Sequence, residues 1–379
     1  MLFSLSILHK GYPLPQERST VNPSSAIRSG CPIVPVSIPR RSRRKRVANL
    51  VQMGENSGME KPHRYPVIFN PRARSQKGGR VLRFIESHAE RLELHPTNYA
   101  GEAREIAARF AAQGAPVVIA AGGDGTLNEV VNGLVGSRTL LGVLPAGTMN
   151  VFAREMGIPF DSLEQAFQVI ERGFVQDVDL FGANGAPFVQ MAGVGFDALV
   201  IEETTWESKK MLGPLAYLLA AVKVLGAKPP KLEVICADGR REEGVAVLAG
   251  NGSLYGGPFK FFRNASNHDS KLDVLIYKEA GYRLVLDSLR GLAFGGIDLM
   301  ASTTYLQAEE FTVQADVDVP VQVDGEWIGR FREVHFVEMA HRLRVIAPEE
   351  ALIGGFSDAM KSLLQWPSRP VELQTTRSL

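Results

Sequence analysis

A glycine-rich turn that contains a single acid is the first stretch of this chain whose residue types and spacing could do chemistry. The turn, Gly122-Gly-Asp-Gly-Thr126, follows the apolar run Val117–Ala120, and apolar residues then recur at helical spacing. Without Cβ atoms the backbone of such a turn can approach an anion closely, and the first N–H groups of the helix point at it. A bare carboxylate would repel phosphate, so Asp124 fits this site if a divalent cation lies between the acid and the phosphates.

The same stretch also fits ordinary helix-start chemistry. Thr126 and Glu129 have the spacing of a capping box, and glycines that precede a helix often serve only a tight turn. Taken alone, the turn allows both interpretations.

Length and composition limit the classes of protein to consider. A chain of 379 residues with 45% hydrophobic content can form two globular domains, and its two cysteines, Cys31 and Cys236, are too few for a disulfide framework. The net charge of +1 hides an asymmetry, because residues 1–63 hold ten Lys or Arg and three Asp or Glu. The remainder is therefore acidic, and we expect no nucleic-acid binding.

The N-terminal 63 residues are rich in Pro, Ser and Arg and lack periodicity, which predicts a disordered basic tail. Its run Arg40–Arg46 could attract anionic lipid, although a solvated tail is the commoner case. Translation that starts at Met53 or Met59 would remove most of this segment. The longest apolar run, Met211–Val222, is too short to span a bilayer, so we expect a cytoplasmic protein that touches the inner membrane surface only peripherally.

Residues 64–173 alternate strand and helix patterns, which predicts an α/β domain with a parallel sheet. Strands are expected at 66–69, 117–120 and 140–144, and helices around 82–92, 103–111 and 162–170. A second glycine turn, Pro145-Ala-Gly-Thr-Met-Asn150, follows the strand at 140–144. Ligands of such sheets bind at the carboxyl ends of strands, where both glycine turns and Asn70-Pro71 are predicted to lie.

From residue 174 to 328 the pattern becomes β-rich and predicts a mainly antiparallel β-sandwich domain. Hairpin signals occur at Asn184-Gly185 and at Asp238-Gly239, the latter between strands expected at 232–236 and 245–249. Two helical stretches, 210–225 and 282–292, interrupt the strands. We expect residues 329–350, with strands around Phe331–Val345, to return to the first domain, and residues 351–379 to form a tail.

Several short motifs follow one another between about Tyr65 and Pro348. They are Phe69-Asn-Pro71, Gly122-Gly-Asp-Gly-Thr-Leu-Asn-Glu-Val-Val-Asn-Gly133, Leu144-Pro-Ala-Gly-Thr-Met-Asn150, Phe152-Ala-Arg154, Val178-Asp-Leu180, Ala192-Gly-Val-Gly-Phe-Asp197, Gly250-Asn-Gly252, Tyr255-Gly-Gly257 and Val323-Asp-Gly-Glu326. This ordered set resembles the diacylglycerol kinase catalytic-domain family, in its bacterial-type branch related to sphingosine and ceramide kinases. The glycine turn alone is shared with NAD kinases.

The resemblance implies transfer of the γ-phosphoryl group of ATP to a lipid hydroxyl, with Mg²⁺, in a cleft between an α/β domain and a β-sandwich domain. It implies that Asp324 is the base for the acceptor hydroxyl. Asp124 and Asp179 would organise the metal. The residues that it places at the nucleotide are Asn70, Gly122, Gly123, Asp124, Gly125, Thr126, Gly147, Thr148 and Asn150.

Each of these acids also has a simpler interpretation. Asp324-Gly325 between two strand-like runs is a common hairpin turn, and Asp179 could be an ordinary strand-end acid. Asp269 and Asp273 could hold a structural Mg²⁺, as in some relatives, or could be solvated turn residues. The family usually has Asp where this chain has Val151, so one carboxylate of the implied metal network is missing.

Three functions therefore stay open from the sequence. The leading hypothesis is a lipid kinase whose acceptor lipid the sequence does not specify. The alternatives are an NAD kinase-like enzyme that shares the glycine turn, and a non-catalytic regulator that binds nucleotide or lipid after losing the acid at position 151.

Overall fold

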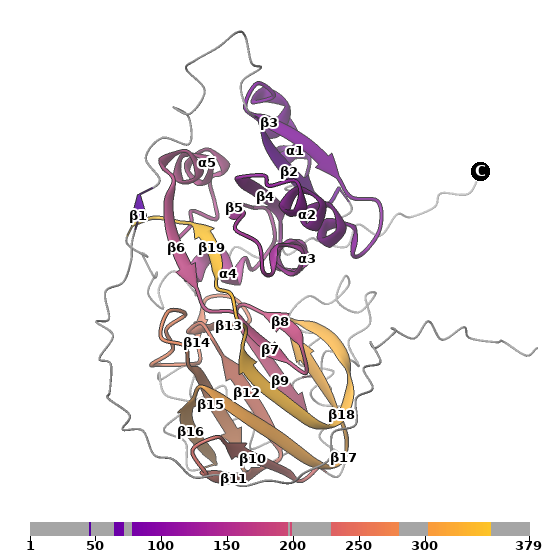
Figure 1. Ribbon diagram of the computed structural model, residues 1–379, viewed down its shortest axis with the longest axis vertical. Helices are drawn as coiled ribbons and strands as arrows, with labels where there is room; N and C mark the ends of the chain where they lie inside the picture. The colour runs from indigo at the N-terminus through magenta and orange to yellow at the C-terminus, as the bar shows by residue number, and fades with distance from the viewer. Residues whose placement is uncertain are drawn as a thin grey trace, which may run out of the picture. The chain divides into compact units, whose positions relative to one another are not determined.

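The computed structural model describes residues 45–46, 64–71, 78–195, 198, 229–279 and 302–349. Two large sheets account for most of them, an α/β layer followed in sequence by an antiparallel β layer (Figure 1). The predicted fold class is confirmed. The predicted helices at 210–225 and 282–292, the apolar run 211–222 and the C-terminal segment 351–379 lie outside the described residues. No helix in the described part of the chain is long and apolar enough to cross a membrane.

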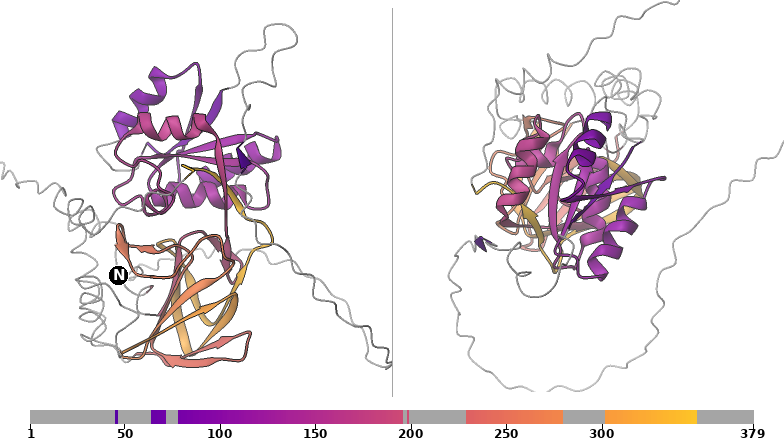
Figure 2. Two further views of the ribbon diagram at one scale, coloured as in Figure 1. Left: turned by 90° about the vertical axis from the view of Figure 1, so that its left-hand side faces the viewer. Right: turned by 90° about the horizontal axis from the view of Figure 1, so that it is seen from above.

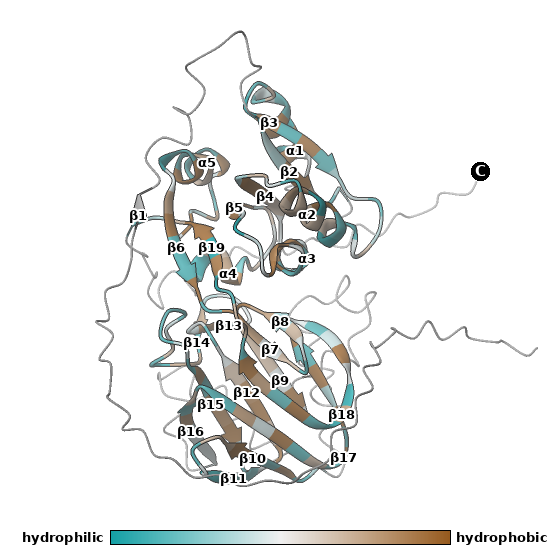
Figure 3. Ribbon diagram, viewed as in Figure 1, coloured by the Kyte–Doolittle hydropathy of each residue, from teal (hydrophilic) through white to brown (hydrophobic). Residues whose placement is uncertain are grey.

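The first sheet has seven strands, and its central ones are fully buried. In spatial order the strands are β1 (Lys45–Arg46), β6 (Phe174–Val178), β19 (Leu343–Ile346), β5 (Leu140–Pro145), β4 (Val117–Gly122), β2 (Tyr65–Phe69) and β3 (Leu92–Pro96). Neighbours from β19 to β3 run parallel, whereas β6 is antiparallel to β19 and to β1. The apolar residues concentrate along β4 and β5, while the edge strand β3 is more polar (Figure 3).

Five helices accompany the first sheet and lie on both of its faces (Figure 2). They are α1 (Gly78–Ser87), α2 (Glu102–Ala112), α3 (Asp124–Leu134), α4 (Val151–Glu155) and α5 (Leu163–Arg172). The rings of Phe84 and Phe167, with centroids 6.0 Å apart, join α1 to α5. On the α2–α3 pair, a Cβ on Gly133 would lie only 2.4 Å from the carbonyl oxygen of Arg104, so glycine lets these helices approach closely.

The second sheet is antiparallel, and its strands contribute to a larger and a smaller hydrophobic cluster. Its strands are β7 (Phe181–Ala183), β8 (Ala186–Phe188), β9 (Met191–Gly195), β10 (Leu232–Cys236), β11 (Arg241–Gly244), β12 (Ala246–Gly250), β15 (Leu272–Tyr277), β16 (Thr303–Ala308), β17 (Glu310–Val323) and β18 (Glu326–Glu338). The sheet branches at the long strand β17, because one half of it pairs with β10 and the other half with β9. A separate two-stranded sheet consists of β13 (Leu254–Tyr255) and β14 (Phe259–Lys260).

Some predicted boundaries differ from the structure for identifiable reasons. The strand at 232–236 pairs with β11 rather than with residues 245–249, because the turn at Asp238-Gly239 is tight and only four residues follow it in the hairpin. The predicted helix around 82–92 ends at Ser87, since Leu92 already begins the edge strand β3. The turn at Asn184-Gly185 joins β7 to β8 as predicted, with φ values of 47° and 82°.

The residues at which the chain passes from one sheet to the other also differ from the predicted domain bounds. Strand β6 belongs to the first sheet although it lies beyond residue 173, and only β19 returns there. Phe331 belongs to β18, which stays hydrogen-bonded to β17 along most of its length. Within the predicted disordered tail, Lys45–Arg46 forms β1, since the backbone of β6 offers an open edge with which it can pair.

Candidate active site

Three loops open at the same edge of the first sheet, as the sequence predicts. In the parallel register Gly122 lies opposite Pro145, and Ala121 lies opposite Phe69. The residues that follow these strands therefore emerge side by side. The N–H of Ala146 donates to the carbonyl of Gly122 at 2.8 Å, which ties the second glycine turn to the first.

The two glycine turns contact each other through their backbones. A Cβ on Gly147 would lie 2.4 Å from the Cα of Gly123, so no other residue fits there without a backbone shift. Asn150, buried and at φ 48°, closes the second turn: its Oδ1 accepts from the N–H of Gly147 at 2.9 Å and its Nδ2 donates to the carbonyl of Gly147 at 3.0 Å. The glycines thus shape the cradle itself, while Gly125 and Thr148 are exposed on it.

The capping-box prediction is wrong because α3 begins earlier than that pattern requires. Gly123 is the residue before the helix, and Asp124 is its first residue. Thr126 is therefore inside the first turn, where it is buried and packs over Gly122. Glu129 instead accepts a hydrogen bond at 3.1 Å from the N–H of Ala103, at the start of α2.

The carboxylate of Asp124 lies near the start of helix α4. Burial raises the pKa of Asp124, and the backbone N–H groups of Val151, Phe152 and Asn150 oppose that rise by stabilising the ionised form. An acid at this end also complements the positive end of the short helix. Asp124 therefore connects the two glycine turns.

The described residues do not by themselves form a magnesium site. Val151 offers no oxygen ligand from its side chain. Within the described ranges no group of three or more His, Cys, Asp or Glu side chains could enclose a metal ion. Any Mg²⁺ at this site would need ligands in addition to the acid side chains of the described residues.

Asp179 and Asp269 lie together in a different cluster. Asp179, fully buried after β6, accepts from the N–H of Ser270 at 2.6 Å and pairs with Arg342 at 2.8 Å. Burial raises the pKa of Asp269, and the charge of Asp179 raises it further. The interactions of Asp179 therefore group it with Asp269 rather than with Asp124.

Asp273, the other acid considered for a structural cation, is bonded within the second sheet. It is buried on β15, where the Tyr305 hydroxyl donates to it and Gln307 Nε2 lies 3.3 Å from both of its oxygens. Burial raises the pKa of Asp273 to about 7.

Asp324 forms the turn between β17 and β18, and both interpretations of this residue have a structural basis. It has φ 47° and Gly325 has φ 83°, as in a tight hairpin. Its carboxylate accepts from the backbone N–H groups of Val189, Gln190 and Met191, each at 2.9 Å. Burial raises the pKa of Asp324 to about 6, the three N–H bonds lower it, and the charge of Asp124 adds to the rise.

The hairpin turn of the second sheet faces the glycine turn of the first. A Cβ on Gly125 would lie 3.8 Å from Oε1 of Glu326, two residues after Asp324. The electrostatic effect of Asp124 on Asp324 also shows that the two acids are close. Beside them, a Cβ on Gly257 would lie 3.2 Å from the sulfur of Met149 in the second glycine turn. The structure thus brings Asp124, Gly125 and Asp324 together.

Comparisons with known proteins agree with an α/β domain followed by a β-rich domain. Residues 64–183 match the diacylglycerol kinase catalytic domain, and residues 190–347 match the YegS C-terminal NAD kinase beta sandwich-like domain. A diacylglycerol kinase from Bacillus subtilis (strain 168) is 31% identical over 296 residues, which cover 75% of this chain and 96% of the relative. This chain belongs to the diacylglycerol kinase family. It is a phosphotransferase with an alcohol group as acceptor.

Two further relatives of the family agree. A diacylglycerol kinase from Staphylococcus aureus (strain MRSA252) is 30% identical over 304 residues, covering 75% of this chain and 92% of the relative. The crystal structure of a diacylglycerol kinase from Bacillus anthracis str. Sterne has a TM-score of 0.63 at 25% identity and covers 76% of this chain and 97% of its own.

Two residues of this diacylglycerol kinase-family chain escaped the sequence analysis, namely Glu155 and Gln190. Both are buried, and Gln190 Nε2 donates to Oε2 of Glu155 at 3.1 Å. Glu155 is the last residue of α4, and Gln190 supplies one of the N–H groups that donate to Asp324. Their spacing of 35 residues follows no helix or strand period, so only the fold brings them together.

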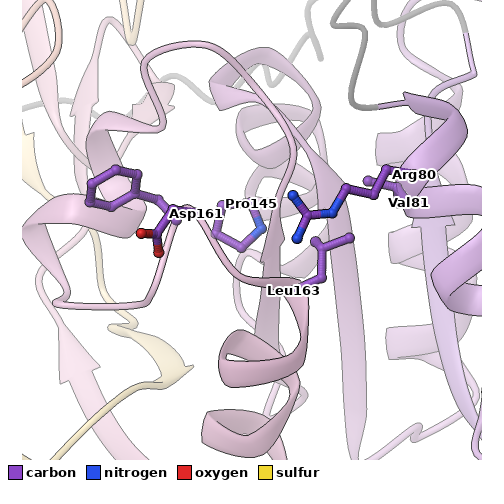
Figure 4. Close-up of a pocket in the computed structure, with 6 residues that line it drawn as sticks. Arg80, Val81, Pro145, Asp161 and Leu163 are labelled. Carbon is purple, nitrogen blue, oxygen red and sulfur yellow. The ribbon is translucent and has the colours of Figure 1, made fainter. Parts of the chain in front are cut away.

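A small pocket lies on the other side of the second glycine turn. Its lining includes Arg80 of α1 and Pro145 at the end of β5, and Figure 4 shows the guanidinium of Arg80 pointing toward Pro145 and Leu163. Arg80 also lies 3.9 Å from Glu164. The pocket contains none of the residues predicted to bind nucleotide, although Pro145 adjoins them in sequence.

Proposed function

We propose that the protein transfers the γ-phosphoryl group of ATP to the hydroxyl of a lipid such as diacylglycerol, with Mg²⁺ carried on the phosphates of the nucleotide. The observation that carries this proposal is the position of Asp324 opposite the glycine cradle. The cradle residues come from the α/β domain, and the acid comes from the β-rich domain. We propose that residues 64–173 supply the nucleotide side and residues 174–328 the lipid side.

The glycine cradle suits the phosphates of ATP. Helix α3 begins at Asp124, so the N–H groups of its first turn have no acceptor inside the helix and point toward the cradle. Exposed Gly125 and Thr148 would lie against the phosphates, next to Asn70, Gly122, Gly123, Thr126, Gly147 and Asn150. Because Asp124 and Asp324 both carry negative charge nearby, a cation must accompany the nucleotide, and Mg²⁺ supplies that neutralisation.

Asp324 suits the role of base for the acceptor. The lipid hydroxyl oxygen would attack the γ-phosphorus, and the bond from that phosphorus to the oxygen bridging to the β-phosphate would break, which releases ADP. The hydroxyl proton would pass to Asp324. With its pKa near 6, Asp324 is largely ionised at neutral pH yet basic enough to take a proton as the new bond forms.

The surface beside Asp324 supports a lipid acceptor. Trp327, two residues from Gly325 on the same hairpin, is 49% exposed. An exposed indole suits a boundary between water and lipid, because one part of the ring is apolar and its N–H is polar. We therefore propose that this edge makes a transient, peripheral contact with the inner membrane surface, at the cytoplasmic side.

A labelling experiment tests the proposal. Purified protein is incubated with Mg²⁺ and γ-³²P-labelled ATP together with diacylglycerol, a sphingoid base, ceramide or NAD, and the products are separated. We expect label in a lipid, and Asp324→Asn should remove it, while Asp318→Asn, on β17 and paired with exposed Arg332, should not. Label in NAD alone would establish the NAD kinase-like alternative. ATP binding without any labelled product would favour a non-catalytic regulator.

A further inference from the structure

Helix α4 and the segment after β8 connect the two acids of the site through buried hydrogen bonds. We propose that Glu155 is a positioning residue: by holding Gln190 it fixes the backbone donors that orient Asp324. The catalytic role of Glu155 rests on the proposed function, since the orientation of Asp324 matters for catalysis only if Asp324 is the base. The hydrogen bonds between Glu155, Gln190 and Asp324 can be tested whether or not the protein turns over substrate.

Glu155 is a buried acid whose carboxylate is fully engaged. Its side chain is 8% exposed, and no Lys or Arg among the described residues pairs with it. Oε2 accepts from Gln190 Nε2 at 3.1 Å and from the N–H of Leu254 at 2.9 Å, and Oε1 accepts from the Ser253 hydroxyl at 3.0 Å. Burying a carboxylate is costly unless hydrogen bonds replace water, so these three donors account for its presence.

Gln190 is the element that Glu155 holds. Its amide Nε2 also donates to the carbonyl of Leu254 at 2.9 Å, and a Cβ on Gly252 would lie 2.4 Å from that same nitrogen. The Gln190 side chain is therefore fixed by hydrogen bonds on one side and by close packing against Gly252 on the other. A rotation of this side chain would require Glu155 or Gly252 to move.

The backbone of Gln190 connects the fixed Gln190 side chain to Asp324. The N–H of Gln190 donates to Oδ1 of Asp324, and the N–H groups on either side, of Val189 and Met191, donate to the same carboxylate. Asp324 thus takes its orientation from a three-residue segment whose central side chain is fixed by Glu155.

The same helix reaches the nucleotide side. The N–H groups at the start of α4 lie near the carboxylate of Asp124, and Glu155 is the last residue of that helix. One five-residue helix therefore links the glycine cradle to the donors around Asp324. Because reacting atoms must meet within a few tenths of an ångström, a loosened link should slow the chemical step more than it weakens nucleotide binding.

The test measures the pKa of Asp324 directly, in full-length protein labelled with ¹³C at aspartate carboxyl groups, with Asp324→Asn used to assign its signal. Asp124 and Glu326 lie close to Asp324, Arg154 lies near Asp124, and Glu155 is linked to Asp324 through Gln190. If Glu155 acted only through its charge, Glu155→Ala would lower the pKa of Asp324. If it positions the donors, their loosening should raise that pKa by about half a unit or more.

Glu155→Gln separates the two effects further. Its amide oxygen can accept from Gln190 and Leu254 while its NH₂ group donates to the Ser253 hydroxyl, so the positions are kept although the charge is lost. We expect the pKa of Asp324 to stay near the wild-type value in Glu155→Gln. Gln190→Ala, which breaks the link without touching the acid, should raise it as Glu155→Ala does.

Kinetics give an independent measure. We expect kcat to fall about tenfold in Glu155→Ala with the KM for ATP changed less than about twofold. Glu171→Ala serves as the control, because Glu171 is an exposed acid of α5 that pairs with Arg91. A pKa of Asp324 that is unchanged or lower in both folded Glu155→Ala and Gln190→Ala would overturn the inference. Absence of any lipid phosphorylation by the wild type would instead overturn the proposed function and leave the pKa result standing.

Discussion

Asp124 starts helix α3 beside the first sheet, and Asp324 lies in the turn between two strands of the second sheet. Backbone N–H groups of consecutive residues lie near each carboxylate: those of residues 150–152 lower the pKa of Asp124, and those of residues 189–191 donate to Asp324. Burial raises the pKa of both acids. They differ in what the donors belong to: those of Asp124 start helix α4, whereas those of Asp324 lead into strand β9.

This difference indicates that a shared mode of hydrogen bonding does not assign a shared role. Asp124 stabilises the junction of two glycine turns, which is a structural task at the nucleotide side. Asp324 sits on an exposed hairpin turn beside Glu326, where an acceptor hydroxyl could approach it. We therefore expect Asp124 to control nucleotide binding and Asp324 to control the rate of reaction.

The largest effect should come from exchanging each acid for its amide. Asp324→Asn should lower kcat by about 10³-fold, because an amide cannot accept the hydroxyl proton, while ATP affinity changes little. Asp124→Asn should instead raise the KM for ATP. Each variant turns an NH₂ group toward backbone N–H groups, so we expect both to lower the free energy of unfolding, by roughly 1–3 kcal/mol. Initial rates, calorimetric ATP titrations and thermal melts measure these effects. Equal effects of the two variants on kcat and on the KM for ATP would abolish the distinction.

A smaller effect should follow from crowding the two glycine turns. Gly147→Ala would place a Cβ 2.4 Å from the Cα of Gly123, so one turn must move, at a cost of about 1–3 kcal/mol in stability. We expect the KM for ATP to rise about tenfold or more, with kcat less affected. Gly79→Ala is the matched control, because its Cβ would meet only Arg83 at 3.8 Å. An unchanged KM in Gly147→Ala would argue against the cradle as the phosphate site.

The smallest effect concerns pH. The ionised form of Asp324 is the base, so activity should fall as pH drops through about 6. For stability the sign is opposite: the folded acid keeps its proton to about 6, whereas the unfolded one loses it near 3.8. The free energy of unfolding should thus decrease between about pH 4 and 6, by up to about 3 kcal/mol, relative to Asp324→Asn. Rate profiles and denaturant melts across this range check both signs, and a rate profile that is flat from pH 5 to 7 would exclude Asp324 as the base.

The fold could be predicted from the sequence where patterns are local. The buried strand β4 is an uninterrupted run of apolar residues that ends in glycine, and the turn at Asn184-Gly185 has a residue pair that favours positive φ. The return of the chain to the first domain is predicted within residues 329–350, and β19 confirms it, whereas β18 stays paired with β17.

The candidate site also has a part that local sequence patterns predict and a part that they do not. The glycine turns and the Asp324 turn are contiguous motifs, so the sequence alone predicts their residues as candidates. The backbone N–H groups near Asp124 and Asp324 lie about 25 and 135 residues away in sequence, and Glu155 meets Gln190 across 35 residues. Such contacts depend on how the two sheets meet, which no local pattern encodes.

The most direct test is a crystal structure with Mg²⁺ and a non-hydrolysable ATP analogue. The account predicts that the triphosphate lies at the start of α3, with its γ-phosphate on the side that faces Asp324 and Glu326. A triphosphate bound away from Gly122–Thr126, or an Asp324 carboxylate screened from the γ-phosphate by other protein groups, would contradict it.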